Sequence, residues 1–333
     1  MPGHGRNQAL RDVGALPFGH LEFAFCLWDA EGRRKRKVGR VRESRKSVIG
    51  KGLRRRGRLM IQAVSPPRRT LDAIPAPRTE PKPKEPSYVA PLAPRLVDSP
   101  VFVLSSVRSG STLLRVLLNS HSRIRAPHEM HLRTVHVQLT RSFTPDAMKA
   151  LQLDKTELEH LLWDRVMHLE LTRSGKDVIV DKTPPNTLIW PRLHRCWPNA
   201  RYILLLRHPG AIIASLTDRR REPDHAAILA EVLSYSEKLE EARQTLDAHV
   251  VTYEELTAEP EKATRAICEY LGVEWESGML DYGSKDHGKF RPQLGDWSST
   301  IKSGKIQPAR TADPTVELPP RLQEIAKAWG YEV

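Results

Sequence analysis

Residues 100–120 read PVFVLSSVRSGSTLLRVLLNS, and this stretch decides the fold class. Its first half is a short apolar run typical of a buried strand, and its second half carries leucines at helical spacing. RSGST at 108–112 forms a glycine-containing turn between the two. Strand, tight loop and helix in this order predict that backbone N–H groups and the helix dipole meet at the loop, where they favour an anion such as phosphate.

The rest of the chain alternates short apolar runs with amphipathic segments. Further strands are expected at 177–180, 201–206 and 249–256, and helices at about 154–172, 210–219, 225–246, 260–271 and 319–329. Such alternation is typical of a parallel sheet that is covered on both faces. The predicted fold class is therefore α/β, a three-layer P-loop-like domain with a central parallel sheet flanked by helices.

Charge and proline are concentrated at the N-terminal end. Residues 1–98 hold 22 of the 53 Lys and Arg but only 9 of the 40 Asp and Glu, which accounts for the whole formal charge of +13. Neither the Arg-rich run at 31–58 nor the Pro-rich run at 65–95 has the apolar periodicity of a packed element. We expect a basic, Pro-rich, disordered tail at 1–96, with Met60 as an alternative start, and one folded domain at 97–333.

The cysteines and the apolar runs predict a cellular location. Cys26, Cys196 and Cys268 are odd in number and far apart, a pattern that predicts neither a disulfide framework nor a zinc cluster. Apolar runs stay well short of the roughly 18 residues of a membrane span, and the N-terminus lacks the pattern of a secretory signal. We expect a cytoplasmic protein without a membrane span; the sequence does not indicate its oligomeric state.

The loop after the first strand differs from an ATP-binding P-loop. When Gly110 and Thr112 are aligned with the pattern G-x-x-x-x-G-K-[ST], Ser105 takes the place of the first glycine and Ser111 that of the lysine. Because that lysine reaches the γ-phosphate, this loop lacks the equipment for ATP hydrolysis. Arg108 supplies one positive charge, which suits a 5′-phosphosulfate without a metal ion.

Three segments resemble landmarks of the sulfotransferases that use 3′-phosphoadenosine-5′-phosphosulfate (PAPS), in the bacterial and tyrosylprotein-sulfotransferase-like branch. FVLSSVRSGSTLLRVLLNSHSRI (102–124) resembles the 5′-phosphosulfate-binding loop of that family, and RYILLLRHPGAIIASL (201–216) is similar to its 3′-phosphate-binding strand and helix. VTYEELTAEPEKATRAICEYLGV (251–273) resembles the segment that brings an aromatic residue near the nucleotide. The resemblance covers about residues 99–333 and implies PAPS as co-substrate, PAP as product and no metal.

The resemblance also implies which residues bind the donor. An arginine at the strand end and a serine eight residues later hold the 3′-phosphate in the family, because a guanidinium binds phosphate in a bidentate manner and a hydroxyl adds a neutral donor. The implied donor-binding residues of this chain are Arg108, Ser109, Gly110, Ser111, Thr112, Arg207, Ser215 and Tyr253.

Two further segments supply catalytic candidates. Sulfonate transfer needs a base for the proton of the acceptor, a cation for the leaving phosphate and in-line alignment. APHEMHL (126–132) places Glu129 where related sulfotransferases have their base, with His131 as an alternative or a partner. DKTPPN (181–186) resembles the segment whose lysine reaches the sulfonate or the bridging oxygen. The implied catalytic residues are Glu129, His131, Lys182 and Arg108.

The segment FRPQLGDWSSTIKSGKI (290–306) matches the family less well. Cytosolic members carry an R-K-G-x-x-G-D-W type loop over the nucleotide, and here Pro292 stands in place of its first glycine while the sequence GDW at 295–297 is kept. The candidate cations of this segment are Arg291, Lys302 and Lys305.

Two other functions stay open. A P-loop kinase of a small metabolite is disfavoured because the lysine is missing and no carboxylate is evidently placed for Mg²⁺. Nucleic-acid binding is not expected of the folded domain, but the Arg-rich tail is an alternative basis for it. The acceptor also stays open: it is a hydroxyl, or less favourably an amine, of a small molecule, a glycan, a lipid or a carrier-bound intermediate.

Overall fold

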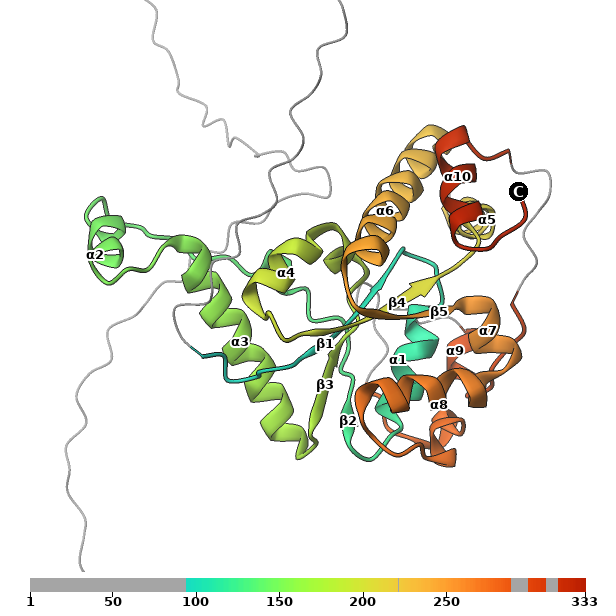
Figure 1. Ribbon diagram of the computed structural model, residues 1–333, viewed down its shortest axis with the longest axis horizontal. Coiled ribbons are helices and arrows are strands. Elements are labelled where there is room, and N and C mark those ends of the chain that lie inside the picture. Colours follow the sequence, from blue (N-terminus) through green and yellow to red (C-terminus); the bar gives the residue numbers. More distant parts are fainter. Residues whose placement is uncertain (1–93, 221, 289–298, 310–316) are drawn as a thin grey trace, which may run out of the picture. The chain divides into compact units, whose positions relative to one another are not determined.

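Figure 1 shows the computed structural model of the chain, which describes residues 94–220, 222–288, 299–309 and 317–333. The described part contains a five-stranded sheet in the order β2-β3-β1-β4-β5, in which every neighbouring pair is parallel. The predicted α/β class with a central parallel sheet is therefore confirmed. The strands are β1 (Val101–Ser105), β2 (Ile124–Arg125), β3 (Val178–Asp181), β4 (Arg201–Leu206) and β5 (Ala248–Thr252).

Helices connect the strands and cover the sheet. No helix in the described part is both long enough and apolar enough to cross a bilayer. The helices are α1 (Ser111–Asn119), α2 (Thr144–Ala150), α3 (Lys155–Ser174), α4 (Trp190–Cys196), α5 (Pro209–Arg219), α6 (His225–Thr245), α7 (Tyr253–Ala258), α8 (Pro260–Leu271), α9 (Ser299–Lys302) and α10 (Pro320–Ala328), with 3-10 turns η1 (Leu132–Thr134), η2 (Pro184–Ile189), η3 (Ser277–Met279) and η4 (Tyr282–Ser284).

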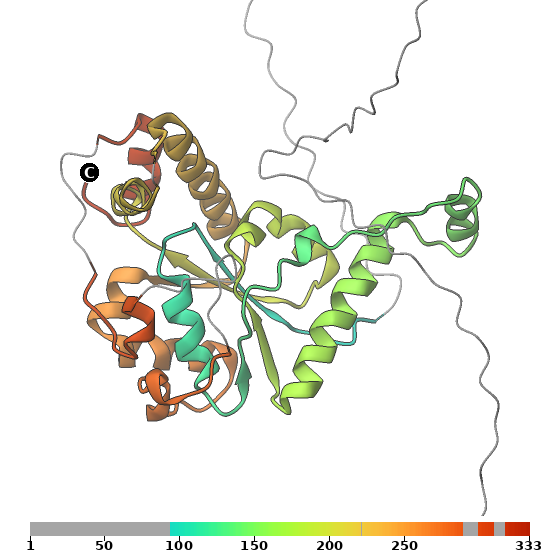
Figure 2. The same cartoon turned by 180° about the vertical axis from the view of Figure 1, so that it is seen from behind.

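The side chains of β1 alternate between two cores, as the pleat of a strand requires. Val101 and Val103 pack with residues of α1 and α8 on one face of the sheet. Phe102 and Leu104 pack with residues of α3, α4 and α6 on the other face. Figures 1 and 2 show the sheet between these two groups of helices. All five residues of β1 are buried, which explains why the sequence of this strand is a continuous apolar run.

The topology brings distant segments to one edge of the sheet. β1 lies between β3 and β4, and Val101 is in register with Val180 on one side and with Arg201 on the other. Because the strands are parallel, the segments that follow β1, β3 and β4 all leave at the same edge. Ligands of open α/β sheets bind at such carboxyl edges.

Most of the elements expected from the sequence are present. The predicted helices at 154–172, 210–219, 225–246, 260–271 and 319–329 correspond to α3, α5, α6, α8 and α10.

The predicted strand at 249–256 was wrong at its C-terminal end. β5 stops at Thr252, because Thr252 and Glu255 form a reciprocal capping box that starts α7. Tyr253 is therefore the first residue of a helix and not a strand residue.

Asp164 on α3 anchors the chain where it enters β1. Its carboxylate accepts hydrogen bonds from the backbone N–H groups of Leu96 (2.7 Å) and Val97 (3.1 Å) and from the indole Nε1 of Trp197 (3.2 Å). The Asp164 side chain is buried, so these three donors replace the water that it would otherwise bind. The start of the central strand is thereby tied to α3 and to the residue after α4.

We predict that Asp164→Ala lowers the free energy of unfolding by about 3 kcal/mol, because three donors lose a buried, charged acceptor. Urea denaturation followed by circular dichroism measures this change. Asp177→Ala is the control: its carboxylate pairs with Arg123 at the surface, and such pairs contribute about 1 kcal/mol or less. Equal losses in the two variants would contradict the role given to Asp164.

Candidate functional site

The loop between β1 and α1 has a backbone shape that its sequence requires. Arg108 and Gly110 both have positive φ angles, 63° and 82°. A Cβ atom on Gly110 would lie 2.1 Å from Cδ2 of Tyr253, so only glycine fits below this ring. α1 begins directly after Gly110 without a capping side chain. The backbone N–H groups in the first turn of α1 therefore point toward the carboxyl edge of the sheet.

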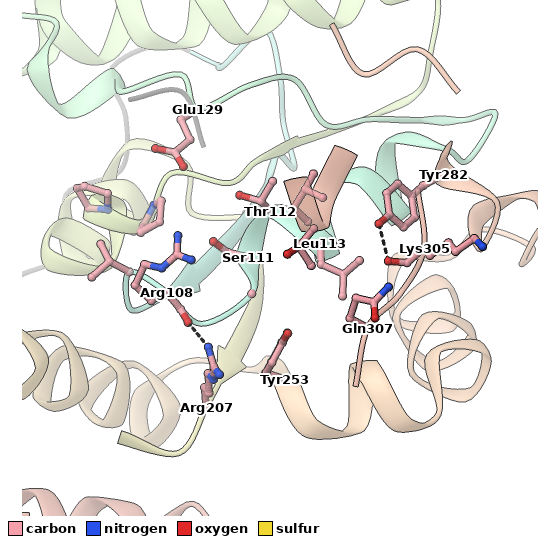
Figure 3. A pocket seen from close by; sticks show the side chains of 16 residues that line it. Arg108, Ser111, Thr112, Leu113, Glu129, Arg207, Tyr253, Tyr282, Lys305 and Gln307 are labelled. Atoms are coloured by element: carbon pink, nitrogen blue, oxygen red, sulfur yellow. Dashed lines mark hydrogen bonds between the residues drawn. The ribbon is translucent and has the colours of Figure 1, made fainter. Parts of the chain in front are cut away.

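A cavity of about 320 Å³ lies at this edge (Figure 3). It contains side chains from the β1–α1 loop, from the ends of β4 and β5, and from two segments that follow β2 and β3. The lining residues are Val107, Arg108, Gly110, Ser111, Thr112, Leu113, Glu129, Pro184, Pro185, Arg207, Tyr253, Tyr282, Thr300, Ile301, Lys305 and Gln307.

Of the eleven donor-binding and catalytic residues implied by the resemblance, seven line the cavity directly, namely Arg108, Gly110, Ser111, Thr112, Glu129, Arg207 and Tyr253. Three others stand behind it and touch a lining residue. Lys182 and His131 contact Glu129, and Ser215 accepts a hydrogen bond of 3.4 Å from Nε of Arg108. Ser109 is buried in the loop and is not among the lining residues.

Arg207 joins three elements at the end of β4. Its Nη1 donates a hydrogen bond of 2.7 Å to the carbonyl of Arg108, and its guanidinium carbon lies 4.5 Å from the ring centre of Tyr253. Tyr253 in turn covers Gly110. The loop, the end of β4 and the start of α7 therefore hold one another in place. Figure 3 shows Arg207 below Arg108, with Tyr253 beside it.

Glu129 and Lys182 form a nearly buried ion pair. Figure 3 shows Glu129 on the opposite side of the cavity from Arg207. Nζ of Lys182 lies 2.5 Å from Oε1 of Glu129 and 3.4 Å from the hydroxyl of Thr112. The other carboxylate oxygen of Glu129 is 3.5 Å from Nε2 of His131. Burial lowers the pKa of Lys182, and the adjacent carboxylate opposes that shift. One oxygen of Glu129 is thus held by the ammonium group of Lys182, and the other lies beside the imidazole of His131.

Arg115 is a buried cation that the sequence analysis missed. It lies on α1 at 2% exposure and donates a hydrogen bond of 3.3 Å to the carbonyl of Ala126, where the loop that carries Glu129 begins. Burial, with a smaller effect of Arg125, lowers the pKa of Arg115 to about 10, so the group stays charged at neutral pH. An arginine inside the apolar run LLRVLL was the signal that could have revealed it.

The far wall of the cavity comes from the C-terminal part of the chain and was only partly expected. Lys305 was a candidate and lines the cavity, whereas Lys302 is not among the lining residues. Arg291 and the GDW sequence at 295–297 lie outside the described residues. Tyr282, which the sequence analysis missed, donates a hydrogen bond of 3.0 Å to the carbonyl of Lys305.

Two glycines let this wall approach the body of the protein. A Cβ atom on Gly304 would lie 2.7 Å from Cα of Gly283, and one on Gly283 would lie 2.8 Å from Cα of Gly304. The two backbones therefore cross at a distance that no side chain allows. This crossing brings Lys305 and Gln307 to the cavity. The sequence does not indicate it, because Gly283 and Gly304 lie far apart along the chain and neither belongs to a recognisable motif.

The charges that line the cavity favour an anionic guest. Arg108, Arg207 and Lys305 contribute positive charge, and Glu129 is the single carboxylate among the lining residues. Glu129 is itself paired with Lys182. Within the described ranges there is no group of three or more His, Cys, Asp and Glu side chains that could hold a metal ion.

Fold and cavity together define an α/β protein with a glycine-containing, anion-favouring loop at the carboxyl edge of a parallel sheet. A family model described as the sulfotransferase family matches residues 100–277. The chain therefore belongs to the sulfotransferase family.

Two curated relatives illustrate how distant the similarity is. The chain is 28% identical over 208 residues to nodulation protein NoeE of Sinorhizobium fredii, covering 52% of this chain and 50% of that protein. It is 24% identical over 199 residues to protein-tyrosine sulfotransferase 2 of Gallus gallus, covering 55% and 53%. The chain thus spans about half the length of these relatives.

Solved structures show the same fold. The sulfotransferase domain from the curacin biosynthetic pathway superposes with a TM-score of 0.56 at 24% identity, over 71% of this chain and 98% of that one. The sulfotransferase domain from the Synechococcus PCC 7002 olefin synthase gives 0.55 at 25% identity, over 71% and 97%.

We predict that Gly304→Ala loosens the far wall of the cavity, because the added Cβ cannot fit against Gly283. Hydrogen exchange measured by mass spectrometry should be at least about tenfold faster in peptides from 299–309. Gly272→Ala is a matched control: Gly272 has a similar φ of 67° but nothing within 4 Å of an added Cβ. The same increase in the control would attribute the effect to backbone strain and not to the crossing.

Proposed function

We propose that this protein is a PAPS-dependent sulfotransferase that moves a sulfonate group from PAPS to a hydroxyl, or less favourably an amine, of its acceptor. The observation that carries the proposal is the composition of one cavity. A loop without the P-loop lysine faces Arg207 on one side and the Glu129–Lys182 pair on the other. This set suits a donor with a 5′-phosphosulfate and a 3′-phosphate better than it suits ATP with Mg²⁺.

In this proposal the donor is bound at its two charged ends. The loop from Arg108 to Thr112 and the N-terminus of α1 hold the 5′-phosphosulfate. Arg207 and Ser215 hold the 3′-phosphate, and Tyr253 lies beside the nucleoside. Support comes from the contacts that already link these residues: Arg207 to the carbonyl of Arg108, and Arg108 to Ser215.

The proposed reaction is an in-line displacement at sulfur. The acceptor oxygen forms a bond to sulfur, while the bond between sulfur and the 5′-phosphate oxygen breaks and leaves its electron pair on PAP. Glu129 takes the proton of the acceptor hydroxyl. Lys182 and Arg108 stabilise the charge that develops on the leaving phosphate. His131 contacts Glu129 and either orients it or shares the proton.

The proposal extends to the chemical class of the acceptor, the extent of the catalytic domain and the cellular compartment. Several relatives are named protein-tyrosine sulfotransferases, a name that supports a hydroxyl acceptor as the chemical class. We propose residues 97–333 as the catalytic domain and 1–96 as an accessory tail. Cys196 and Cys268 are free thiols, which accords with a reducing compartment such as the cytoplasm.

We predict that micromolar PAP raises the melting temperature without Mg²⁺, because a ligand that binds only the native state stabilises it by mass action. ATP with Mg²⁺ should raise it much less. Arg207→Ala should weaken PAP binding by about 1.5–3 kcal/mol, the range for a lost charge-assisted hydrogen bond, and Ser215→Ala by less. Thermal shift and calorimetric titration measure these effects.

Arg173→Ala serves as the control for charge, because Arg173 is exposed near the end of α3. Equal stabilisation by PAP and by ATP with Mg²⁺ would favour the kinase alternative. Unchanged PAP affinity in both the Arg207 and Ser215 variants would remove these residues from the donor site.

We further predict that Glu129→Gln lowers turnover by roughly 10² to 10⁴, because the amide keeps the shape of the carboxylate but cannot accept the proton. PAP affinity should stay close to that of the wild type, and His131→Ala should give a smaller loss. Turnover is measured as PAP release from PAPS. Glu170→Gln, at a partly buried pair with Arg125 outside the lining of the cavity, is the control.

Nearly normal turnover of Glu129→Gln beside a folded but inactive His131→Ala variant would move the role of base to the histidine.

A further inference from the structure

The hydroxyl of Thr183 connects the end of β3 with the backbone of the loop that carries Glu129. Its Oγ1 donates a hydrogen bond of 2.7 Å to Oδ1 of Asp181. The same oxygen accepts bonds from the backbone N–H groups of Met130 (3.0 Å) and His131 (3.4 Å). Thr183 and Asp181 are both fully buried, so water does not compete for these bonds.

Asp181 fixes the direction of this hydroxyl. A hydroxyl has one proton and two lone pairs, so a proton given to the carboxylate leaves the lone pairs for the two amides. The second oxygen of Asp181 accepts a bond of 2.8 Å from Nδ2 of Asn186, which holds the carboxylate itself in place. Burial raises the pKa of Asp181, and the bonds from Thr183 and Asn186 oppose that rise.

A fully buried carboxylate is costly, and an apolar residue of similar size often stabilises a core at least as well. Asp181 is absent from the lining of the cavity, and both of its carboxylate oxygens are engaged by Thr183 and Asn186. Its partners lead instead to the loop that carries Glu129. Because this costly carboxylate lies directly beneath a candidate catalytic loop, we infer that Asp181 serves to fix the conformation of that loop.

The loop also needs to be held, because its backbone is strained. His131 has φ 50° and ψ 34°, in the left-handed region that is unfavourable for residues other than glycine. The hydroxyl of Thr183 accepts a hydrogen bond from the N–H group of His131. The carbonyl of His131 accepts two bonds from Thr134, one from its backbone N–H (2.9 Å) and one from its hydroxyl (2.8 Å). Lys182, the neighbour of Thr183 in the chain, fixes the side chain of Glu129 at 2.5 Å.

We propose that Thr183, oriented by Asp181, is a positioning residue that holds the backbone at 130–131 and thereby aims the Glu129 carboxylate at the acceptor proton. This role rests on the function proposed above. Thr183 binds neither donor nor acceptor and acts only through Glu129. Its loss therefore lowers the rate of proton transfer and leaves donor binding unchanged.

Thr183→Val tests this role, because valine keeps the shape and removes the hydroxyl. Turnover is measured as PAP release from PAPS, with phenol as the hydroxyl acceptor; water is also present as an acceptor in every assay. Turnover of the variant should fall by about 10- to 100-fold. The Kd of PAP should stay within about twofold of the wild type, and Thr183→Ser, which keeps the hydroxyl, should retain turnover within about threefold. Thr264→Val is the matched control, because Thr264 on α8 is equally buried, but its hydroxyl donates to the carbonyl of Pro260 and accepts from the indole of Trp275, away from the 126–132 loop.

The decisive comparison uses the background of Glu129→Gln. If Thr183 acts through Glu129, Thr183→Val causes no further loss of turnover once the base is absent, whereas a merely structural defect causes the same loss in both backgrounds. An equal loss in both backgrounds, or turnover of Thr183→Val within about twofold of the wild type, overturns the proposal. If Thr183→Val does not fold, Thr183→Ala takes its place, because alanine also removes the hydroxyl and adds no branched carbon to the site.

A second measurement separates this proposal from the function on which it rests. Hydrogen exchange of the peptide at 126–132 should be faster in Thr183→Val than in the wild type and unchanged in Thr264→Val. Unchanged exchange in Thr183→Val overturns the positioning role whatever the activity is. A wild-type protein that transfers no sulfonate from PAPS overturns the proposed function, and hydrogen exchange then decides alone whether Thr183 holds the loop.

Discussion

The ammonium group of Lys182 has no contact with solvent, and its charge has to be balanced by groups inside the protein. Glu129 provides the balancing carboxylate at 2.5 Å, although it stands 53 positions earlier in the chain. Arg115, also buried nearby, lowers the pKa of Lys182 further and makes an acidic partner more necessary. The loop at 126–132 is therefore held over the end of β3, beside Thr112 in the first turn of α1. The arrangement of the carboxyl edge of the sheet depends on this pairing.

The two halves of the cavity are joined through the backbone of the β1–α1 loop. Arg108 offers its carbonyl to Arg207 and its side chain to Ser215, and it lines the same cavity as Glu129. Tyr253 fills the space above Gly110 and lies against the guanidinium of Arg207. A change at any of these contacts shifts the loop. The lysine that pairs with Glu129 and the two arginines proposed to bind the donor follow three neighbouring strands, β3, β1 and β4.

Local signals in the sequence were sufficient for much of the fold. The apolar run of β1 and the leucine spacing of α1 are visible without the structure, and α8 is bracketed by Pro260 and Gly272. The end of β5 was mistaken because the capping box of Thr252 and Glu255 was not recognised. Long-range contacts were harder to predict. The bond between Thr183 and Met130 requires β2 to lie next to β3, and the crossing of Gly283 and Gly304 leaves no periodic pattern in the sequence.

Transfer of label distinguishes the account from its main alternative most directly. The full chain is incubated with a metabolite extract and either ³⁵S-labelled PAPS, or ATP carrying ³²P in its γ-phosphate together with Mg²⁺. For a PAPS-dependent sulfotransferase we expect ³⁵S to appear in an acceptor of the extract, PAP to accumulate in equal amount, and no ³²P to be transferred. Transfer of ³²P without transfer of ³⁵S would contradict the assignment as a PAPS-dependent sulfotransferase.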